Sequence, residues 1–102
     1  MSSTDIQVQN NEAAHRFEVV QDSYLAELDY QRQGAQIIFT HTEVPAALEG
    51  RGIGGALAKA GLEFARANQL QVVPLCPFVR SYIERKPEYQ PLVSATTSGG
   101  FG

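Results

Sequence analysis

The chain has 102 residues, of which 43% are hydrophobic and 19% charged, a composition typical of one folded domain and not of a disordered chain. Its formal net charge is −3, and its eight Lys and Arg residues are spread along the sequence. Duplex nucleic acid and anionic membranes both require a concentrated basic surface, so we expect neither as a partner.

Few residues of the chain could form a cross-link or bind a metal. Cys76 is the single cysteine, which rules out an intramolecular disulfide. His15 and His41 lie far from it in the sequence and lack the spacing of a zinc site, so we expect no metal. The opening residues show no basic head before an apolar run, and no apolar stretch reaches the length of a membrane span. We therefore expect a cytoplasmic protein without a signal peptide.

Alternating apolar and polar residues predict strands in the N-terminal half. Short polar or glycine-containing turns separate these segments, and the last of them is rich in β-branched and aromatic residues. Strict alternation in this last segment would place His41 on the face that carries Phe39, unless a bulge changes the parity. We expect four successive antiparallel strands, a meander, over residues 6–9, 15–20, 23–31 and 35–44.

The period of the apolar residues lengthens after Val44. From Ile53 to Phe64 they recur at helical spacing, while charged residues such as Glu63 fall on the opposite side. This pattern predicts an amphipathic helix over residues 52–68.

The last third of the chain completes an α+β fold of order β-β-β-β-α-β-α. A short apolar strand is predicted at 71–76, and a second helix, with proline in its first turn, at 77–86. The strands at 35–44 and 71–76 should be parallel and joined by a right-handed crossover. We expect residues 1–93 to form the domain and residues 94–102 to be a flexible tail.

The stretch EGRGIGGAL, residues 49–57, places four glycines at the start of the predicted helix. A Walker loop would need Gly-Lys followed by Ser or Thr, which the stretch lacks. The dinucleotide fingerprint GxGxxG matches through Gly50, Gly52 and Gly55. However, no acidic residue follows at the distance where that motif needs one for the ribose, and the preceding strands are antiparallel.

A third template, the acyl-coenzyme A loop Q/R-x-x-G-x-G/A, matches Gly52-Ile53-Gly54. Pyrophosphate oxygens require several main-chain N–H donors at short range, and a Cβ atom would hold them away. A helix N-terminus supplies such donors together with the positive end of the helix dipole. A glycine-rich turn without a ligand is the alternative interpretation.

Three segments, HTEVP, GRGIG and VVPLCPFVRSYIERKPEY, occur in this order and resemble the GNAT-type N-acetyltransferases. The similarity is strongest to the minimal single-domain branch of that superfamily, which carries a cysteine after its fifth strand, and it covers residues 6–93. Glu49 departs from the pattern, because Gln or Arg is common at this loop position. We expect Glu49 to point outward and Arg51 to neutralise the pyrophosphate.

The resemblance implies that acetyl-coenzyme A binds where the strands at 35–44 and 71–76 separate. The main chain that would hold the pantetheine arm belongs to Thr42, Glu43 and Val44. The amides that would hold the pyrophosphate belong to Arg51, Gly52, Ile53, Gly54, Gly55 and Ala56. The acetyl group would pass to an amine of a small molecule, a peptide or a protein, and the chain would be a monomer or a weak homodimer. The alternatives are a non-catalytic module that binds coenzyme A, acyl-coenzyme A or a partner protein, and a purely structural domain.

Cys76 directly precedes the helix that begins with Pro77, which is an N-cap-like position at the end of the last predicted strand. A helix N-terminus stabilises a thiolate, and a thiolate could accept the acetyl group in a two-step transfer. The alternative is a small buried cysteine that only packs.

Two further residues are candidates for proton transfer. His41, directly or together with Glu43, could deprotonate the incoming ammonium group, although both could simply be half-exposed strand residues. The resemblance implies that Tyr82 donates a proton to the departing coenzyme thiolate, whereas tyrosines on amphipathic helices are often packing residues.

Overall fold

The computed structural model describes residues 6–93 and shows a mixed α+β fold. The helices and strands of this part of the chain are, in order, β1 (Gln9–Asn11), β2 (Arg16–Gln21), β3 (Tyr24–Gln33), β4 (Gln36–Glu43), α1 (Ile53–Ala67), β5 (Gln71–Pro74) and α2 (Pro77–Arg85). Three short 3-10 helices accompany them, η1 (Glu12–Ala14), η2 (Ala46–Leu48) and η3 (Pro87–Leu92). The expected tail at 94–102 lies outside the described residues.

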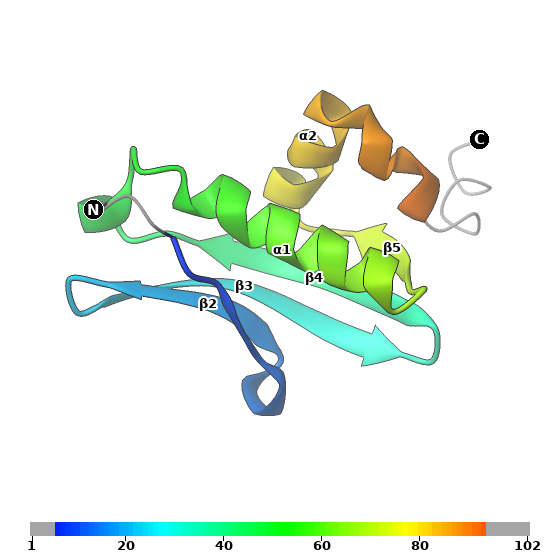
Figure 1. Ribbon diagram of the computed structural model, residues 1–102, viewed down its shortest axis with the longest axis horizontal. Coiled ribbons are helices and arrows are strands. Elements are labelled where there is room, and N and C mark those ends of the chain that lie inside the picture. The colour runs from blue at the N-terminus through cyan, green and yellow to red at the C-terminus, as the bar shows by residue number, and fades with distance from the viewer. Residues whose placement is uncertain (1–5, 94–102) are drawn as a thin grey trace.

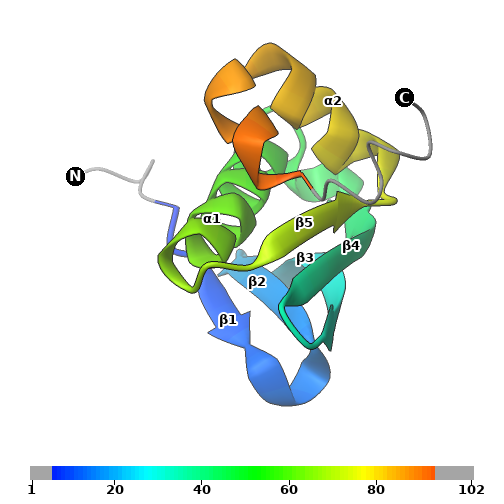
Figure 2. The same ribbon diagram turned by 90° about the vertical axis from the view of Figure 1, so that its right-hand side faces the viewer.

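The strands form one sheet in the order β1-β2-β3-β4-β5 (Figure 1). The first four pair antiparallel, and β5 pairs parallel to β4. The β4-α1-β5 connection is therefore the predicted βαβ unit. Figure 2 shows α1 and α2 on the same side of this sheet. Within residues 6–93, no helix is long and apolar enough to cross a membrane.

The predicted boundaries of three strands were wrong by two residues or more, and the third strand runs to Gln33 and not to residue 31. The first strand lies at Gln9–Asn11 and not at residues 6–9, because the Asn11 side chain accepts a hydrogen bond from the Ala14 N–H at 3.1 Å and moves the turn into η1. The fifth strand ends at Pro74, two residues before Cys76. Proline has no N–H to donate, so it terminates the ladder there.

A β-bulge in β4 changes which side chains face the helices. Tyr30 pairs with Phe39, but the next residue back on β3, Asp29, pairs with His41, so Thr40 is an extra residue. One extra residue reverses the alternation of a strand. The expectation that His41 shares a face with Phe39 was therefore wrong. Thr42, opposite the fully buried Leu28, now faces the helices, whereas His41 lies on the other face.

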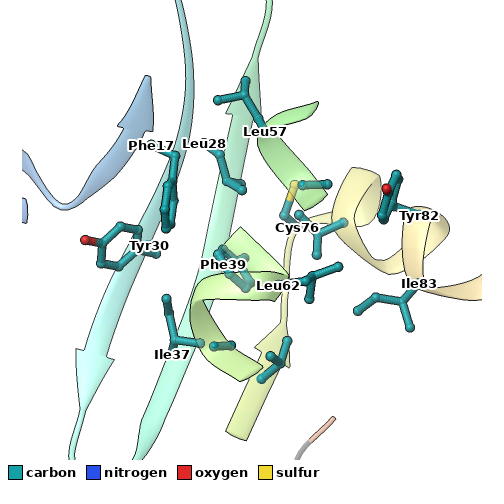
Figure 3. Close-up of a cluster of buried hydrophobic side chains, with 14 of the residues drawn as sticks. Phe17, Leu28, Tyr30, Ile37, Phe39, Leu57, Leu62, Cys76, Tyr82 and Ile83 are labelled. Carbon is teal, nitrogen blue, oxygen red and sulfur yellow. The ribbon is translucent and has the colours of Figure 1, made fainter. Parts of the chain in front are cut away.

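The core lies between the sheet and the helices, and Figure 3 shows part of it. Gly61 of α1 packs directly on the sheet, since a Cβ atom there would lie 2.8 Å from the Phe39 ring. Glu63 does more than face solvent as expected, because its carboxylate accepts a hydrogen bond from the Tyr89 hydroxyl at 2.6 Å. This hydrogen bond connects η3 to α1. The largest fully buried side chains are Tyr89, Phe39, Leu28, Ile37, Leu48, Ile53, Leu57, Leu62, Val19, Val72 and Val79.

Candidate functional site

An opening in the sheet begins where β4 and β5 separate. Their pairing ends with Phe39 opposite Pro74, and the Cys76 N–H then donates to the Phe39 carbonyl at 2.9 Å. β4 continues to Glu43 along β3, and in the described part of the chain no strand pairs with its other edge there. Such an edge offers main-chain donors and acceptors to an extended ligand. Thr42 and Glu43, both expected to bind pantetheine, lie on this stretch, and Val44 directly follows it.

The glycine loop forms the N-terminus of α1. Gly52 is the N-cap with φ of 79°, a left-handed conformation that favours glycine. A Cβ atom at Gly52 would meet nothing within 4 Å, so the backbone conformation and not crowding accounts for this glycine. The amides of Ile53, Gly54 and Gly55 stand in the first helical turn, where the helix provides no acceptor. Unpaired donors at a positive helix end fit a pyrophosphate.

Gly54, but not its neighbour Gly55, is needed for the close approach of α2 to α1. A Cβ atom at Gly54 would lie 2.9 Å from Cζ of Phe78, closer than packing allows. A Cβ atom at Gly55 would lie 3.7 Å from Cε1 of Tyr82, an ordinary contact. The absence of a side chain at Gly54 is thus explained by helix packing.

Arg51 is held by the turn between β2 and β3. Its guanidinium lies 2.9 Å from the Asp22 carboxylate and donates to the Gln21 side chain at 3.0 Å. Arg51 would therefore have to exchange Asp22 for a phosphate to play its expected part. This ion pair is exposed, and such pairs contribute only about 0–1 kcal/mol to stability. The exchange of Asp22 for a phosphate therefore costs little free energy. Glu49 is exposed, in agreement with the expectation that it points outward.

Cys76 lies at the inner end of the opening. It is the N-cap of α2, as predicted, and is only 3% exposed. Its sulfur lies 3.1 Å from the Thr42 hydroxyl, a contact that exists because the bulge turns Thr42 inward. Figure 3 shows Cys76 among the buried side chains, at the start of α2. Nothing in the sequence pattern indicated the pairing of Thr42 with the thiol.

His41 and Glu43 form a separate pair on the opposite face of the sheet. The His41 Nε2 atom lies 3.3 Å from the Glu43 carboxylate, and both side chains are exposed. The structure therefore brings His41 to Glu43 but does not bring either side chain to Cys76.

Tyr82 lies on the buried side of α2 and is 8% exposed. Burial, followed by the nearby negative charge of Glu88, raises the pKa of the Tyr82 phenol. The phenol therefore stays protonated at neutral pH, which a proton donor requires.

The outer face of the sheet places Glu18, Glu27 and Glu43 directly opposite one another on β2, β3 and β4. Hydrogen bonds from Arg16, and then from Asn11, lower the pKa of Glu18. Burial raises the pKa of Glu27, and its neighbours Asp29 and Glu43 add to this effect. Two glutamates that face each other across the sheet thus have opposite effects on stability.

We expect the Glu27→Gln variant to melt at a higher temperature than the parent near neutral pH. Its pKa is raised on folding, so the ionised carboxylate destabilises the protein above that pKa. The advantage of the variant should disappear as the pH falls to the ordinary carboxyl value of 4.5. Glu18→Gln is the matched control and should melt below the parent at neutral pH, with a gap that closes only as the pH falls through the lowered pKa. Thermal melts across this pH range measure the melting temperature of each variant relative to the parent. Melting temperatures that change in the same direction in both variants would contradict the opposite pKa shifts of Glu18 and Glu27.

Comparisons with known proteins agree with this geometry. The family model described as GCN5-related N-acetyl-transferase matches residues 16–92. Protein NATD1 from Gallus gallus and from Mus musculus is 40% identical over 63 residues, which cover 61% of this chain and 57% of theirs. The matched region thus spans little more than half the length of these relatives. Protein NATD1 from Xenopus tropicalis is 32% identical over 88 residues, which cover 83% of this chain and 81% of that protein.

A solved structure is similar over a longer span. The solution NMR structure of a GCN5-like protein from Staphylococcus aureus has a TM-score of 0.67 and 32% sequence identity, and it covers 92% of this chain and 91% of its own. The family match extends from β2 to η3 and includes the opening, the glycine loop and Cys76. The chain therefore belongs to the GCN5-related N-acetyltransferase family.

Proposed function

We propose that this protein binds acetyl-coenzyme A and transfers its acetyl group to an amine. The observation that carries the proposal is the position of the glycine loop relative to the opening. Gly54 lies against Phe78, which follows Cys76 by two residues. The Cys76 N–H in turn donates a hydrogen bond to Phe39, the last residue of β4 that pairs with β5. One ligand can therefore reach from the amides of α1 to the free edge of β4.

The binding residues fit the chemistry of this cofactor. The amides from Arg51 to Gly55 hold the pyrophosphate, whereas the Ala56 N–H, which was expected to join them, donates to the Gly52 carbonyl at 3.1 Å. The free edge of β4 from Thr42 to Val44 holds the pantetheine arm as an added strand. Acetyl-coenzyme A supplies the activated acetyl group as a thioester.

Two routes of transfer have support from the positions of the side chains. The opening lies in the plane of the sheet, so Cys76 borders it from the helix side and His41 from the outer side. In direct transfer, His41, directly or together with Glu43, takes a proton from the ammonium group of the acceptor. In two-step transfer, the Cys76 sulfur would displace coenzyme A from the thioester, and the thiol proton would leave with coenzyme A. The acceptor amine would then take the acetyl group from Cys76 and return the cysteine to its thiol form. The protonated phenol of Tyr82 is available as an acid in either route.

A module that binds coenzyme A without catalysis is the second candidate. The burial of Cys76 and its separation from His41 favour this alternative. A panel of amines separates the two candidates. Loss of turnover in His41→Ala but not in Cys76→Ala supports direct transfer. Loss of turnover in Cys76→Ala, together with an acetyl adduct on the parent protein, supports the two-step route. A parent protein that shows no turnover supports the binding module.

The Gly52→Val variant tests binding itself. Gly52 has a positive φ, and a β-branched residue there is strained by about 1–2 kcal/mol, which displaces the first-turn amides. We expect the affinity for coenzyme A to fall by roughly tenfold or more in isothermal titration calorimetry. Gly34→Val is the matched control, because Gly34 also has a positive φ and open space around it but lies in the turn between β3 and β4. Equal affinity in the two variants, or no binding to the parent, would contradict the proposal.

A further inference from the structure

Phe78 is an aromatic residue that the fold leaves partly exposed. It is the second residue of α2 and 37% exposed. The other large hydrophobic residues with exposed side chains in the described part of the chain are Val20, Tyr24 and Leu75. Leu75 lies just before Cys76, so Phe78 and Leu75 flank the cysteine in the sequence and provide a natural pair for comparison.

The ring of Phe78 lies between the two ends of the candidate site. At one end it covers Gly54, where Cζ, Cε1 and Cε2 of the ring lie within 3.4 Å of the position that a Cβ atom would occupy. At the other end Phe78 is joined through Pro77 to Cys76, the residue at the inner end of the opening. A ligand with a phosphate on the first turn of α1 and a thioester near Cys76 must therefore pass this ring.

We propose that Phe78 positions the pantetheine arm of the coenzyme, an inference that rests on the proposed function. The arm combines amide groups with apolar methyl and methylene groups. The free edge of β4 can pair with the amides, and the face of an aromatic ring suits the apolar groups. Gly54 has no side chain at the one place where a side chain would push the ring away from α1. Phe78 thus determines how firmly the thioester is held at the opening.

The test compares two ligands, coenzyme A and its nucleotide half, which keeps the pyrophosphate and lacks the pantetheine arm. In calorimetric titrations, Phe78→Ala should bind coenzyme A roughly tenfold more weakly than the parent and the nucleotide half with unchanged affinity. Phe78→Tyr should restore the parent affinity. Leu75→Ala is the matched control, since it removes an exposed apolar side chain of the same segment, and should leave both affinities unchanged.

A second pair of variants tests the contact with Gly54. Gly54→Ala should weaken the binding of coenzyme A in the parent but add no further loss in the Phe78→Ala background, because the ring that it displaces is then gone. Equal losses for both ligands in Phe78→Ala, or tighter binding of coenzyme A, would overturn the inference. A parent that fails to bind coenzyme A would overturn both proposals, whereas a parent and a Phe78→Ala variant that bind coenzyme A equally well would overturn only this one.

Discussion

Replacement of Tyr89 by alanine is expected to lower the free energy of unfolding by about 3–5 kcal/mol, the range for removal of a buried aromatic side chain. Tyr89 is 1% exposed and packs beside Tyr82, with ring centroids 6.2 Å apart, while the Arg66 guanidinium lies 5.2 Å from the centre of its ring. Its hydroxyl donates to Glu63 of α1 at 2.6 Å. The alanine variant loses the ring and the bond together, which urea denaturation monitored by circular dichroism would measure.

The Tyr89→Phe variant separates the ring from the hydrogen bond. It should lose about 1–3 kcal/mol, since a bond to a charged acceptor is removed while the packing stays. Burial and the bond to Glu63 raise the pKa of the Tyr89 phenol, so the unfolded chain ionises first as the pH rises past roughly 10. The advantage of the parent over the Phe variant should therefore shrink above that pH. A Phe variant as unstable as the Ala variant would show that the ring contributes nothing.

Gly61→Val is expected to lower the free energy of unfolding by about 2–3 kcal/mol through overpacking. A Cβ atom at this position would lie 2.8 Å from Phe39 and 3.2 Å from Leu28, both completely buried. Protein cores are closely packed, so we expect α1 to move away from the sheet. In a domain of this size the melting temperature should fall by roughly 10–20 °C.

Gly55→Ala is the matched control on the same helix. Its Cβ atom would lie 3.7 Å from Tyr82, an ordinary contact. Alanine has a higher helix propensity than glycine and restricts the unfolded chain more, so this variant should be at least as stable as the parent. A Gly61→Val variant that melts with the parent would mean that α1 lies farther from β4 than the structure shows.

The order of strands and helices could be predicted because it depends on local patterns. Apolar residues alternate with polar ones in β2 and β3 and recur at helical spacing from Ile53 onward. Both patterns arise because one face of each element packs on the same core. The bulge at Thr40 could not be predicted, because Thr40 and Thr42 are both good strand formers and nothing in the chain distinguishes the extra residue. Its effect is nevertheless large, since it decides on which face His41 lies.

In the candidate site, too, features that depend on neighbouring residues could be predicted and contacts between distant residues could not. The glycine loop is a run of neighbouring residues, so a short motif was enough to place it at the start of α1, but the left-handed conformation of Gly52 was not predicted. The contacts of Thr42 with Cys76 and of Gly54 with Phe78 join residues far apart in the chain. They depend on how closely α2 packs against α1 and β4, a property of the assembled fold that no short motif records.

The extra residue in β4 has a consequence for how reactivity is distributed over the molecule. It places a hydroxyl and a basic group of the same strand in two environments: the Thr42 hydroxyl faces the interior beside the Cys76 thiol, and the His41 imidazole faces water. A chain that lacked Thr40 would exchange them, with the imidazole buried beneath the helices and the Thr42 hydroxyl hydrated. A single-residue insertion or deletion in this strand could thus convert one arrangement of reactive groups into the other without any change of fold.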